Sequence, residues 1–474
     1  MLTRASWWAL AALAAAGCAA STQLPQSATP RPAGAAAAQV APADTEPNPF
    51  PSTYRPLPSQ PTLIRNATVM TAAGPTLKNA SVLMSGGKIV AVGTDVAAPA
   101  GAVIIDGAGK YVTPGLIDPH SHIGAGASIE GAELNDVNEI TNPNTAQVWV
   151  EHSVWPQDPQ FWLALAGGVT TEQILPGSAN LFGGRSVVLK NVPARTVEGM
   201  KFPGAPYGLK MACGENPKRV YGNRGGPFTR MGNMAGWRAG WIKAQHYRDE
   251  WAKWRKDGAD PAKRPQRDLQ LETLAGALDG KILVQMHCYR ADEMANVIDM
   301  SHEFGYHVAA FHHAVEAYKI RDLLKQNGIC AIMWSDWWGF KMEAYDGIKQ
   351  NIALVDQSGA CATLHSDDAE GIQRLNQDAA KAMAAGWEAG IKVTPDEAIR
   401  WITYNPAKAL GIERLTGSLE PGKMADVVLW SGDPFSVYSK ADQVFIDGAL
   451  VYDRANPRLQ PTSDFTVGNT EVQP

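Results

Sequence analysis

One pattern recurs through the middle of the chain, over residues 113–410: a short apolar run that ends in a residue able to bind a metal ion. Segments with helical periodicity, such as DEMANVIDMSHEFG, separate these runs. Buried strands that alternate with helices predict a parallel sheet with helices outside it. For a segment of about 300 residues, the economical architecture is a (β/α)8 TIM barrel. The alternative, a doubly wound open sheet, lacks a Gly-rich phosphate loop after its first strand.

The ends of these runs supply the candidate site. The first run closes with DPHSH, in which His120 and His122 project from the same face because side chains alternate along a strand. Active sites of barrel enzymes lie where the strands end, at the C-terminal face. The other runs end in four further candidates: Lys210, His287, His313 and Asp367.

The spacing of the candidates matches a barrel, in which each strand-helix unit takes roughly 31 residues. His287 and His313 are 26 residues apart, or one unit, and His313 and Asp367 are 54 apart, or two units. His122 and Lys210 are 88 apart, or three units. The candidates therefore fall on strands one, four, five, six and eight.

One interval is too long: Lys210 and His287 are 77 residues apart. We interpret the excess as an insertion at about residues 217–270. Between residues 217 and 267 it has thirteen Lys and Arg, four Asp and Glu, and four Trp at helical spacing. The favoured interpretation is amphipathic helices that pack Trp onto the barrel. The alternative is a lid over the barrel mouth, rimmed with positive charge.

Two segments rich in strand patterns flank the barrel. Residues 62–112 and 411–456 alternate apolar and polar residues and are interrupted by Gly. Neither is long enough to be stable alone, so we expect them to pair into a small flanking β-sandwich built from both ends of the chain. The polar residues 457–474 are expected to form a loose tail.

The first 17 residues predict a signal peptide. Arg4 precedes an apolar run of ten residues, Trp7 to Ala16, which is too short to span a bilayer. The sequence AAGC ending at Cys18 resembles a bacterial lipobox, in which the cysteine is lipidated after cleavage; cleavage without an anchor is the alternative. The Ala- and Pro-rich residues 18–61 predict a flexible tether. We expect export to the periplasm or outer membrane.

Charge and cysteine content argue against a nucleic-acid-binding protein, a disulfide-rich scaffold and a thiolate metal site. The 42 Lys and Arg and 47 Asp and Glu give a net charge of −5, so no nucleic-acid partner is expected. Five cysteines are too few for a disulfide scaffold in 474 residues. Cys213 and Cys288 have the opposite strand parity to Lys210 and His287, which argues against a thiolate site. Whether the cysteines pair is left open.

These residues resemble the amidohydrolase superfamily, in its imidazolonepropionase-like and dipeptidase-like branch. The matching pieces are VTPGLIDPHSH, VQMHCYR, HHAVEAYK, HSDD and the closing stretch NPAKALGIERLTGSLEPGKMADVVLWSGDP. The resemblance covers residues 62–453 and implies a TIM barrel with a flanking sandwich. It also implies a first metal at His120, His122 and Asp367 and a second at His287 and His313.

The resemblance further implies that Lys210 matches a strand-four lysine that, carboxylated by carbon dioxide, bridges two metals in many members. An unmodified Lys210 favours a single ion, with Glu215 as the substitute ligand. Imidazoles and a carboxylate suit a divalent metal such as Zn²⁺, with one or two ions. The ion would polarise a carbonyl and acidify bound water. Asp367 would then act as general base and general acid.

Two further residues have predicted roles. Arg290, three residues after His287, is expected to bind a substrate carboxylate, with a helix-start arginine as the alternative. His365 should face the barrel interior one layer deeper than Asp367, as a core histidine rather than a ligand.

The sequence thus predicts an exported metal-dependent amidohydrolase that cleaves C–N bonds of small substrates, either cyclic amides or dipeptides and N-acyl amino acids. One alternative is a non-catalytic, metal-containing surface binding lipoprotein. Another is a metal-dependent isomerase or decarboxylase on the same site, because a fold does not fix a reaction. A membrane is expected as a partner only through a lipid anchor at Cys18. The oligomeric state, a homo-oligomer included, is left open.

Overall fold

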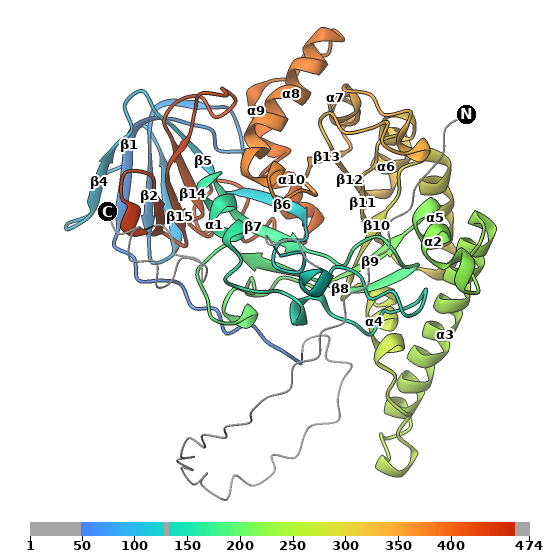
Figure 1. The fold of residues 1–474 in the computed structure, drawn as a ribbon. Coiled ribbons are helices and arrows are strands. Elements are labelled where there is room, and N and C mark those ends of the chain that lie inside the picture. Colours follow the sequence, from blue (N-terminus) through green and yellow to red (C-terminus); the bar gives the residue numbers. More distant parts are fainter. Residues whose placement is uncertain (1–48, 128–131, 460–474) are drawn as a thin grey trace, which may run out of the picture. The chain divides into compact units, whose positions relative to one another are not determined.

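The computed structural model describes residues 49–127 and 132–459 (Figure 1). The predicted signal peptide, Cys18 with most of the tether, and residues 460–474 of the predicted tail lie outside the described residues. Within the described ranges, no helix combines the length and the apolar character needed to cross a bilayer.

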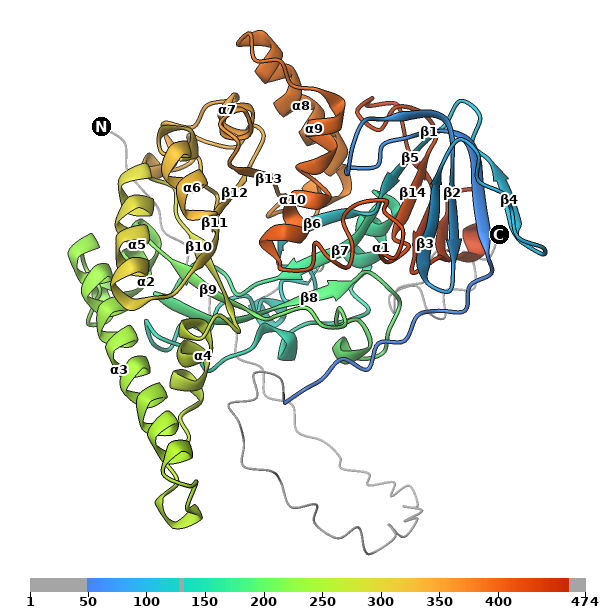
Figure 2. The same cartoon turned by 180° about the vertical axis from the view of Figure 1, so that it is seen from behind.

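Segments from both ends of the chain form one eight-stranded sheet (Figure 2). The order is β16-β15-β14-β5-β1-β2-β3, and β4 pairs with β1. Antiparallel pairing of β5 with β14, with Val112 opposite Leu429, joins the two ends as predicted. The hydrogen bonds give a single sheet, so a two-layer sandwich stays a prediction. The strands are β1 (Thr62–Val69), β2 (Leu77–Ser85), β3 (Lys88–Gly93), β4 (Val103–Asp106), β5 (Tyr111–Pro114), β14 (Val427–Trp430), β15 (Ala441–Ile446) and β16 (Ala449–Asp453).

The second sheet, also of eight strands, is a nearly closed barrel whose strands follow one another in chain order. They are β6 (Leu116–Ser121), β7 (Val169–Ile174), β8 (Phe182–Lys190), β9 (Gly208–Ala212), β10 (Leu283–His287), β11 (Val308–His312), β12 (Cys330–Met333) and β13 (Cys361–Leu364). The first and last strands do not pair directly. Residues 401 and 402 lie between them: Leu364 N donates to Trp401 O at 3.0 Å, and Ile117 N donates to Ile402 O at 2.9 Å.

The barrel departs from the predicted all-parallel (β/α)8 arrangement at its third strand. β8 runs antiparallel to both β7 and β9, whereas the other neighbouring pairs are parallel. Residues 175–181, which connect β7 to β8, are too few for the crossover that a parallel pair needs. The spacing of His122 and Lys210 suits three strand-helix units, yet two of the three connections join antiparallel strands.

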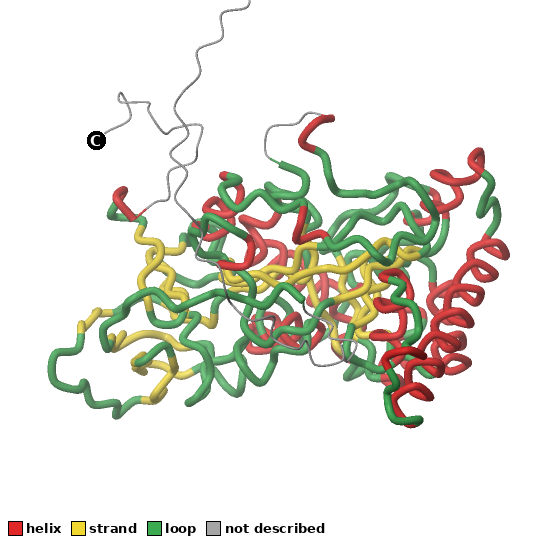
Figure 3. Tube along the Cα trace, turned by 90° about the horizontal axis from the view of Figure 1, so that it is seen from below, coloured by secondary structure: helices red, strands yellow, loops and turns green. Residues whose placement is uncertain are grey.

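Helices flank the barrel strands (Figure 3). Local sequence fixes several ends: Thr394 and Glu397 form a capping box before α9, and Gly305 takes the left-handed conformation that ends α5. The α-helices are α1 (Pro159–Ala166), α2 (Glu215–Tyr221), α3 (Arg230–Lys256), α4 (Leu269–Leu278), α5 (Ala291–Phe304), α6 (Arg321–Asn327), α7 (Asn351–Gln357), α8 (Leu375–Glu388), α9 (Pro395–Arg400) and α10 (Tyr404–Ala409).

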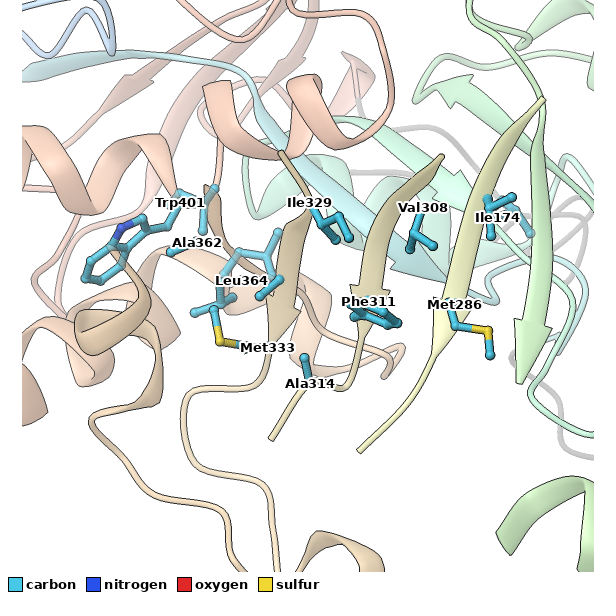
Figure 4. Packing of buried hydrophobic residues seen from close by; sticks show 14 of the residues in the cluster. Ile174, Met286, Val308, Phe311, Ala314, Ile329, Met333, Ala362, Leu364 and Trp401 are labelled. Carbon is cyan, nitrogen blue, oxygen red and sulfur yellow. The ribbon is translucent and has the colours of Figure 1, made fainter. Parts of the chain in front are cut away.

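Alternation along the strands separates an apolar layer from the polar interior. Met286 lies opposite Phe311 in the pairing of β10 with β11, and Met333 lies opposite Leu364 in that of β12 with β13. Figure 4 shows these side chains among the buried residues of the main hydrophobic core. The next residue after Met286 therefore projects to the opposite face, which is how His287 comes to point into the barrel.

The predicted insertion at residues 217–270 forms most of α2, all of α3 and the loop that leads to α4. Its tryptophans are buried outside the sheet: Trp237 Nε1 donates to Leu181 O at 3.1 Å, and the Trp241 ring stacks on Tyr306 with centroids 4.4 Å apart. The chain therefore follows the favoured interpretation, helices that pack Trp onto the barrel. The lid alternative is wrong in this structure, because no residue of 217–270 lines the cavity described below.

A buried ion network ties the barrel to the other sheet. Lys190, at the end of β8, is fully buried, and its Nζ lies 3.1 Å from Asp426 Oδ1 and 2.8 Å from Asp447 Oδ2. Burial raises the pKa of Asp447, and the neighbouring Asp426 carboxylate raises it further, against the opposing effect of Lys190. The ammonium thus holds two buried carboxylates together at the junction of the sheets.

Replacing this ammonium should destabilise the whole body. Lys190→Met leaves two buried carboxylates without their cation, and we expect it to lower the free energy of unfolding by about 3–5 kcal/mol. Urea denaturation followed by circular dichroism measures the change. Lys243→Met, on the exposed side of α3, is the matched control and should leave the midpoint unchanged. An unchanged midpoint in Lys190→Met would show that the junction does not depend on this charge.

Candidate metal centre

Three of the predicted ligands meet at one carboxylate oxygen. His120, at the end of β6, and His122, just beyond it, each place Nε2 3.3 Å from Oδ1 of Asp367. Asp367 follows β13, the last barrel strand, and its backbone N–H donates to His120 O at 3.2 Å. The first and last strands of the barrel therefore bring these three side chains together.

Hydrogen bonds fix which nitrogen of His120 is available. Gln285 donates its amide to Ala409 O, so its Oε1 faces His312 Nε2, at 2.7 Å. An amide oxygen only accepts, so His312 carries its proton on Nε2 and offers Nδ1 to His120 Nδ1, at 2.6 Å. His120 must then donate from Nδ1. Its Nε2 lone pair is left to face Asp367.

The same reasoning applies to His122. Its Nδ1 lies 2.8 Å from Leu175 O, an acceptor, so the ring donates from Nδ1. The Nε2 lone pair of His122 consequently also points at Asp367. A proton acceptor behind each ring is the usual way in which proteins orient metal-ligating histidines.

A second set of imidazoles lies beside the first. The centroid of the His313 ring is 4.4 Å from the ring centroid of His120 and 4.9 Å from that of His287. The Nδ1 atom of His313 is 3.6 Å from Asp367 Oδ2. His365 completes the group: one donor atom each from His120, His313 and His365 lie within 4.8 Å of one another. His313 and Asp367 both have positive φ, at 55° and 54°, a conformation that costs free energy in residues other than Gly.

Lys210 projects into the same region from β9. It is fully buried, and its Nζ lies 3.4 Å from His120 Nε2. Burial lowers the pKa of Lys210 to about 7, with the Asp367 carboxylate acting in the opposite direction. A large share of this amine is therefore uncharged at neutral pH.

The remaining protonation states suit a metal centre. Burial lowers the pKa of His120, His287 and His313 well below the usual value, so the rings are neutral at pH 7. Burial acts to raise the pKa of Asp367, but the adjacent His122 and Lys210 lower it overall, so this carboxylate is ionised. Neutral imidazoles and an ionised carboxylate are the forms that bind divalent ions.

Unpaired buried nitrogens provide a direct test of whether an ion fits. His313 Nδ1 and both ring nitrogens of His365 are buried without a hydrogen-bond partner among the described residues. Such atoms are costly unless something satisfies them. A donor set of imidazoles and a carboxylate is typical of zinc and similar ions. The residues present therefore fit the divalent metal predicted from the sequence.

A cavity of about 570 Å³ opens onto this centre. Its lining includes His122, His287, His313 and Asp367, together with Lys341 and several aromatic side chains. The Trp334 ring stacks on His313, with centroids 4.5 Å apart and planes 29° apart. The cavity is large enough for a small organic substrate.

Two predicted site residues lie elsewhere. Arg290 is the residue before α5, and its guanidinium pairs with Asp292 through Nε–Oδ1 at 2.9 Å and Nη2–Oδ2 at 3.1 Å. It does not line the cavity, so the alternative of a helix-start arginine describes it better. Glu215, the substitute ligand, faces Lys341 at 3.8 Å and is absent from the histidine cluster. His365, expected to be a core histidine, lies within the cluster.

Sequence reasoning missed the residues that support the ligands. His312 ends β11 and contacts His120, but the doubled His in HVAAFHHA was assigned only to His313. Gln285 has the parity of His287 and could have been found from strand alternation. Lys341 and Trp334 follow β12, for which no ligand is predicted, and carry no signal in the local sequence.

Disulfides account for the four cysteines in the described part of the chain. Cys213 is bonded to Cys288, and Cys330 to Cys361. The first pair follows Lys210 and His287 and joins the ends of β9 and β10. The sequence left this pairing open, and its strand-parity argument against a thiolate ligand agrees with the bonded sulfurs.

The support behind His120 can be tested by substitution. His312→Leu removes the acceptor for His120 Nδ1, and we expect zinc affinity to fall by about 10- to 100-fold because the ligand loses its fixed orientation. Competition with a chelating dye measures the affinity. His302→Leu, at an exposed histidine of α5, is the control and should bind zinc as the unaltered protein does. Equal affinities in the two variants would refute the orienting role of His312.

Comparisons with known proteins agree with this arrangement. The Amidohydrolase family model matches residues 267–452. The amidohydrolase tasK of Hapsidospora irregularis is 31% identical over 433 residues, and the chain spans 43% of its length. The match covers 83% of this chain. An imidazolonepropionase of Shewanella sp. (strain ANA-3) is 34% identical over 114 residues, 23% of this chain and 25% of that protein.

A solved structure extends the likeness to a complete chain. The amidohydrolase from Thermotoga maritima MSB8 superposes with a TM-score of 0.77 and 37% sequence identity. The match covers 83% of this chain and 100% of that one. This combination of sequence identity and shared fold confirms the resemblance predicted from the strand-end residues: the chain belongs to the amidohydrolase family, whose members are hydrolases acting on C–N bonds.

Proposed function

We propose that this protein is a metal-dependent hydrolase that cleaves an amide C–N bond in small substrates, either cyclic amides or dipeptides and N-acyl amino acids. The observation that carries the proposal is the meeting of His120 Nε2 and His122 Nε2 at one oxygen of an ionised Asp367, which lines a cavity. Family membership supports the class of reaction.

The ligands of the proposed metal follow from the donor set. His120, His122 and Asp367 would hold a first divalent ion, for which zinc suits the donors. His287 and His313 would hold a second. When bound, such an ion supplies Lewis acidity that polarises a carbonyl and lowers the pKa of water.

Asp367 is the residue proposed to move protons. Its Oδ1 faces His120 and His122, whereas its Oδ2 is directed to the side of His313. Because the carboxylate is ionised, it can accept a proton from the attacking water and then deliver it to the departing nitrogen. The neutral histidines do not compete for that proton, since burial holds their pKa values well below the usual range.

Lys210 determines how many ions the site holds. An uncharged amine can add carbon dioxide to give a carbamate and a released proton, and the lowered pKa of Lys210 supports that reaction. The anionic carbamate would add a ligand that favours two ions, whereas an unmodified amine would favour one. Metal analysis of the protein prepared with and without bicarbonate distinguishes two ions from one.

Asp367→Asn tests the proposed reaction. The amide cannot accept the proton, so kcat should fall by about a hundredfold to ten-thousandfold while the fold is retained. The assay is release of free amine from a panel of dipeptides, N-acetyl amino acids and lactams by the zinc-loaded protein. Chelation of the metal should abolish turnover in the same assay. Near-normal turnover in Asp367→Asn would eliminate its proton-transfer role.

Asp368→Asn is the matched control for that variant. Asp368 Oδ1 accepts hydrogen bonds from the backbone N–H groups of Glu370 and Gly371, and an asparagine oxygen can keep both. Its activity should therefore stay close to that of the unaltered protein. Loss of turnover in both variants would point to a disturbed loop rather than to lost proton transfer.

We also propose that the protein is exported and anchored through a lipid on Cys18. Disulfides persist in oxidising compartments and are rare in the cytosol, so the two disulfides support export. In a bacterial host fed labelled palmitate, the protein should take up label and Cys18→Ser should not. Ser21→Ala, with the cysteine intact, is the control and should remain labelled. An exported but unlabelled protein would indicate cleavage without an anchor.

A further inference from the structure

We infer that Lys341 binds a free carboxylate of the substrate, while the exposed rings of Trp337 and Phe340 take an apolar group of the same molecule. The inference rests on the proposed function in one respect, since it assumes that the scissile amide lies beside Asp367. It narrows the substrate to amides of amino acids that keep their carboxylate and carry an apolar side chain.

Lys341 is positioned for this role by the segment between β12 and α7. It lines the cavity together with His287, His313 and Asp367. Its Nζ donates to Asn216 Oδ1 at 2.9 Å and to Tyr289 Oη at 3.3 Å, and lies 5.2 Å from the centre of the Tyr289 ring. The ammonium is therefore held at a defined point on the cavity wall.

One donor of this ammonium remains available for a ligand. An ammonium has three N–H groups, of which two are taken by Asn216 and Tyr289. Glu215 Oε1 is 3.8 Å away, beyond hydrogen-bond distance. The other nearby acid, Glu343, is paired with Arg230. Within the described part of the chain, the positive charge thus has a loose counter-ion and an open donor.

The distance from the metal centre suits a carboxylate close to the scissile bond. Asn216 joins the two places, because its Nδ2 lies 3.4 Å from His287 Nε2 while its Oδ1 accepts from Lys341. The side-chain amide of Asn216 is therefore the one group between Lys341 and His287, a predicted metal ligand. In an N-acyl amino acid, the carboxylate is likewise a few bonds from the amide carbonyl.

The apolar half of the site is an aromatic wall on the same segment. Trp334 stacks on His313 and contacts Phe340 edge-on, with centroids 5.7 Å apart. Farther out, Trp337 and Phe340 are 44% and 54% exposed, although both line the cavity. Large apolar side chains exposed together at a cavity mouth are typical of ligand-binding surfaces. A substrate side chain would cover them.

The carboxylate half is tested by comparing N-acetyl-L-phenylalanine with its primary amide. Binding is measured by calorimetry on the full chain carrying Asp367→Asn, so that neither probe is turned over. We expect the acid to bind about tenfold tighter than the amide, as charge-assisted hydrogen bonds allow. Adding Lys341→Gln should reduce this preference to about one, and Lys341→Arg should restore most of it.

Lys349→Gln is the matched control, an exposed lysine on the same segment, and should keep the preference. In the active enzyme, Lys341→Gln should raise KM for acids that are hydrolysed with little change in kcat. An equal preference with and without Lys341, or no binding of the acid at all, would overturn the inference.

The apolar half is tested by comparing N-acetyl-L-phenylalanine with N-acetylglycine. Phe340→Ala should weaken binding of the phenylalanine probe by about three- to tenfold and leave the glycine probe unchanged, because only the former covers the ring. Tyr345→Ala, at an exposed ring that does not line the cavity, is the control. Equal losses for both probes would contradict a side-chain subsite.

These measurements separate the inference from the proposed function. A carboxylate preference that depends on Lys341, in a zinc-loaded protein that hydrolyses no amide, would sustain the binding site and reject the reaction. Hydrolysis of amides that does not depend on Lys341 would support the proposed reaction and reject the carboxylate-binding site.

Discussion

The closure of the barrel between its first and last strands is the constraint on which the site depends. His120 and Asp367 are far apart in the chain, and no direct strand pairing joins β6 to β13. Asp118 provides the link: its carboxylate accepts from Ser366 Oγ and from the backbone N–H of His120 at 3.1 Å. Burial raises the pKa of Asp118 to about 7, against these hydrogen bonds, which favour its ionised form. Ser366 directly precedes the predicted ligand Asp367, and His120 is itself a predicted ligand.

Two predicted ligands that lie just beyond the ends of β11 and β13 adopt an unfavourable backbone conformation. His313 and Asp367 hold positive φ, and neither is Gly. Such backbone geometry persists only where packing enforces it. Here Trp334 stacks on His313, and Asp367 N–H is held by His120 O. The apolar layer of Met286, Phe311 and neighbouring residues fixes the strands from which these residues extend (Figure 4).

Strand alternation and spacing predicted the barrel and the convergence of the strand-end histidines, because a period of two and a repeated unit length survive in sequence. The family was predicted from the resemblance of the strand-end motifs. They could not predict that β8 is antiparallel, since an average over three units conceals one short connection. The end of the run HVAAFHHA predicts only His313, whereas His312 is the residue that lies opposite His287, and the positive φ of His313 brings both histidines to the site. Lys341 could not be predicted, because a segment without periodicity positions it.

The disulfide between Cys213 and Cys288 joins the two ends of the long segment that contains α2, α3 and α4. It thereby helps to fix the positions of the metal ligands predicted on either side of that segment. It closes a loop over a sequence separation of 75 residues, which by chain entropy is worth about 4 kcal/mol. The bonded residues directly follow β9 and β10, the strands that carry Lys210 and His287. The bond adds to the parallel pairing of these two five-residue strands, which places Lys210 opposite Gln285. An oxidising environment therefore stabilises the positions of two predicted ligands as well as the fold.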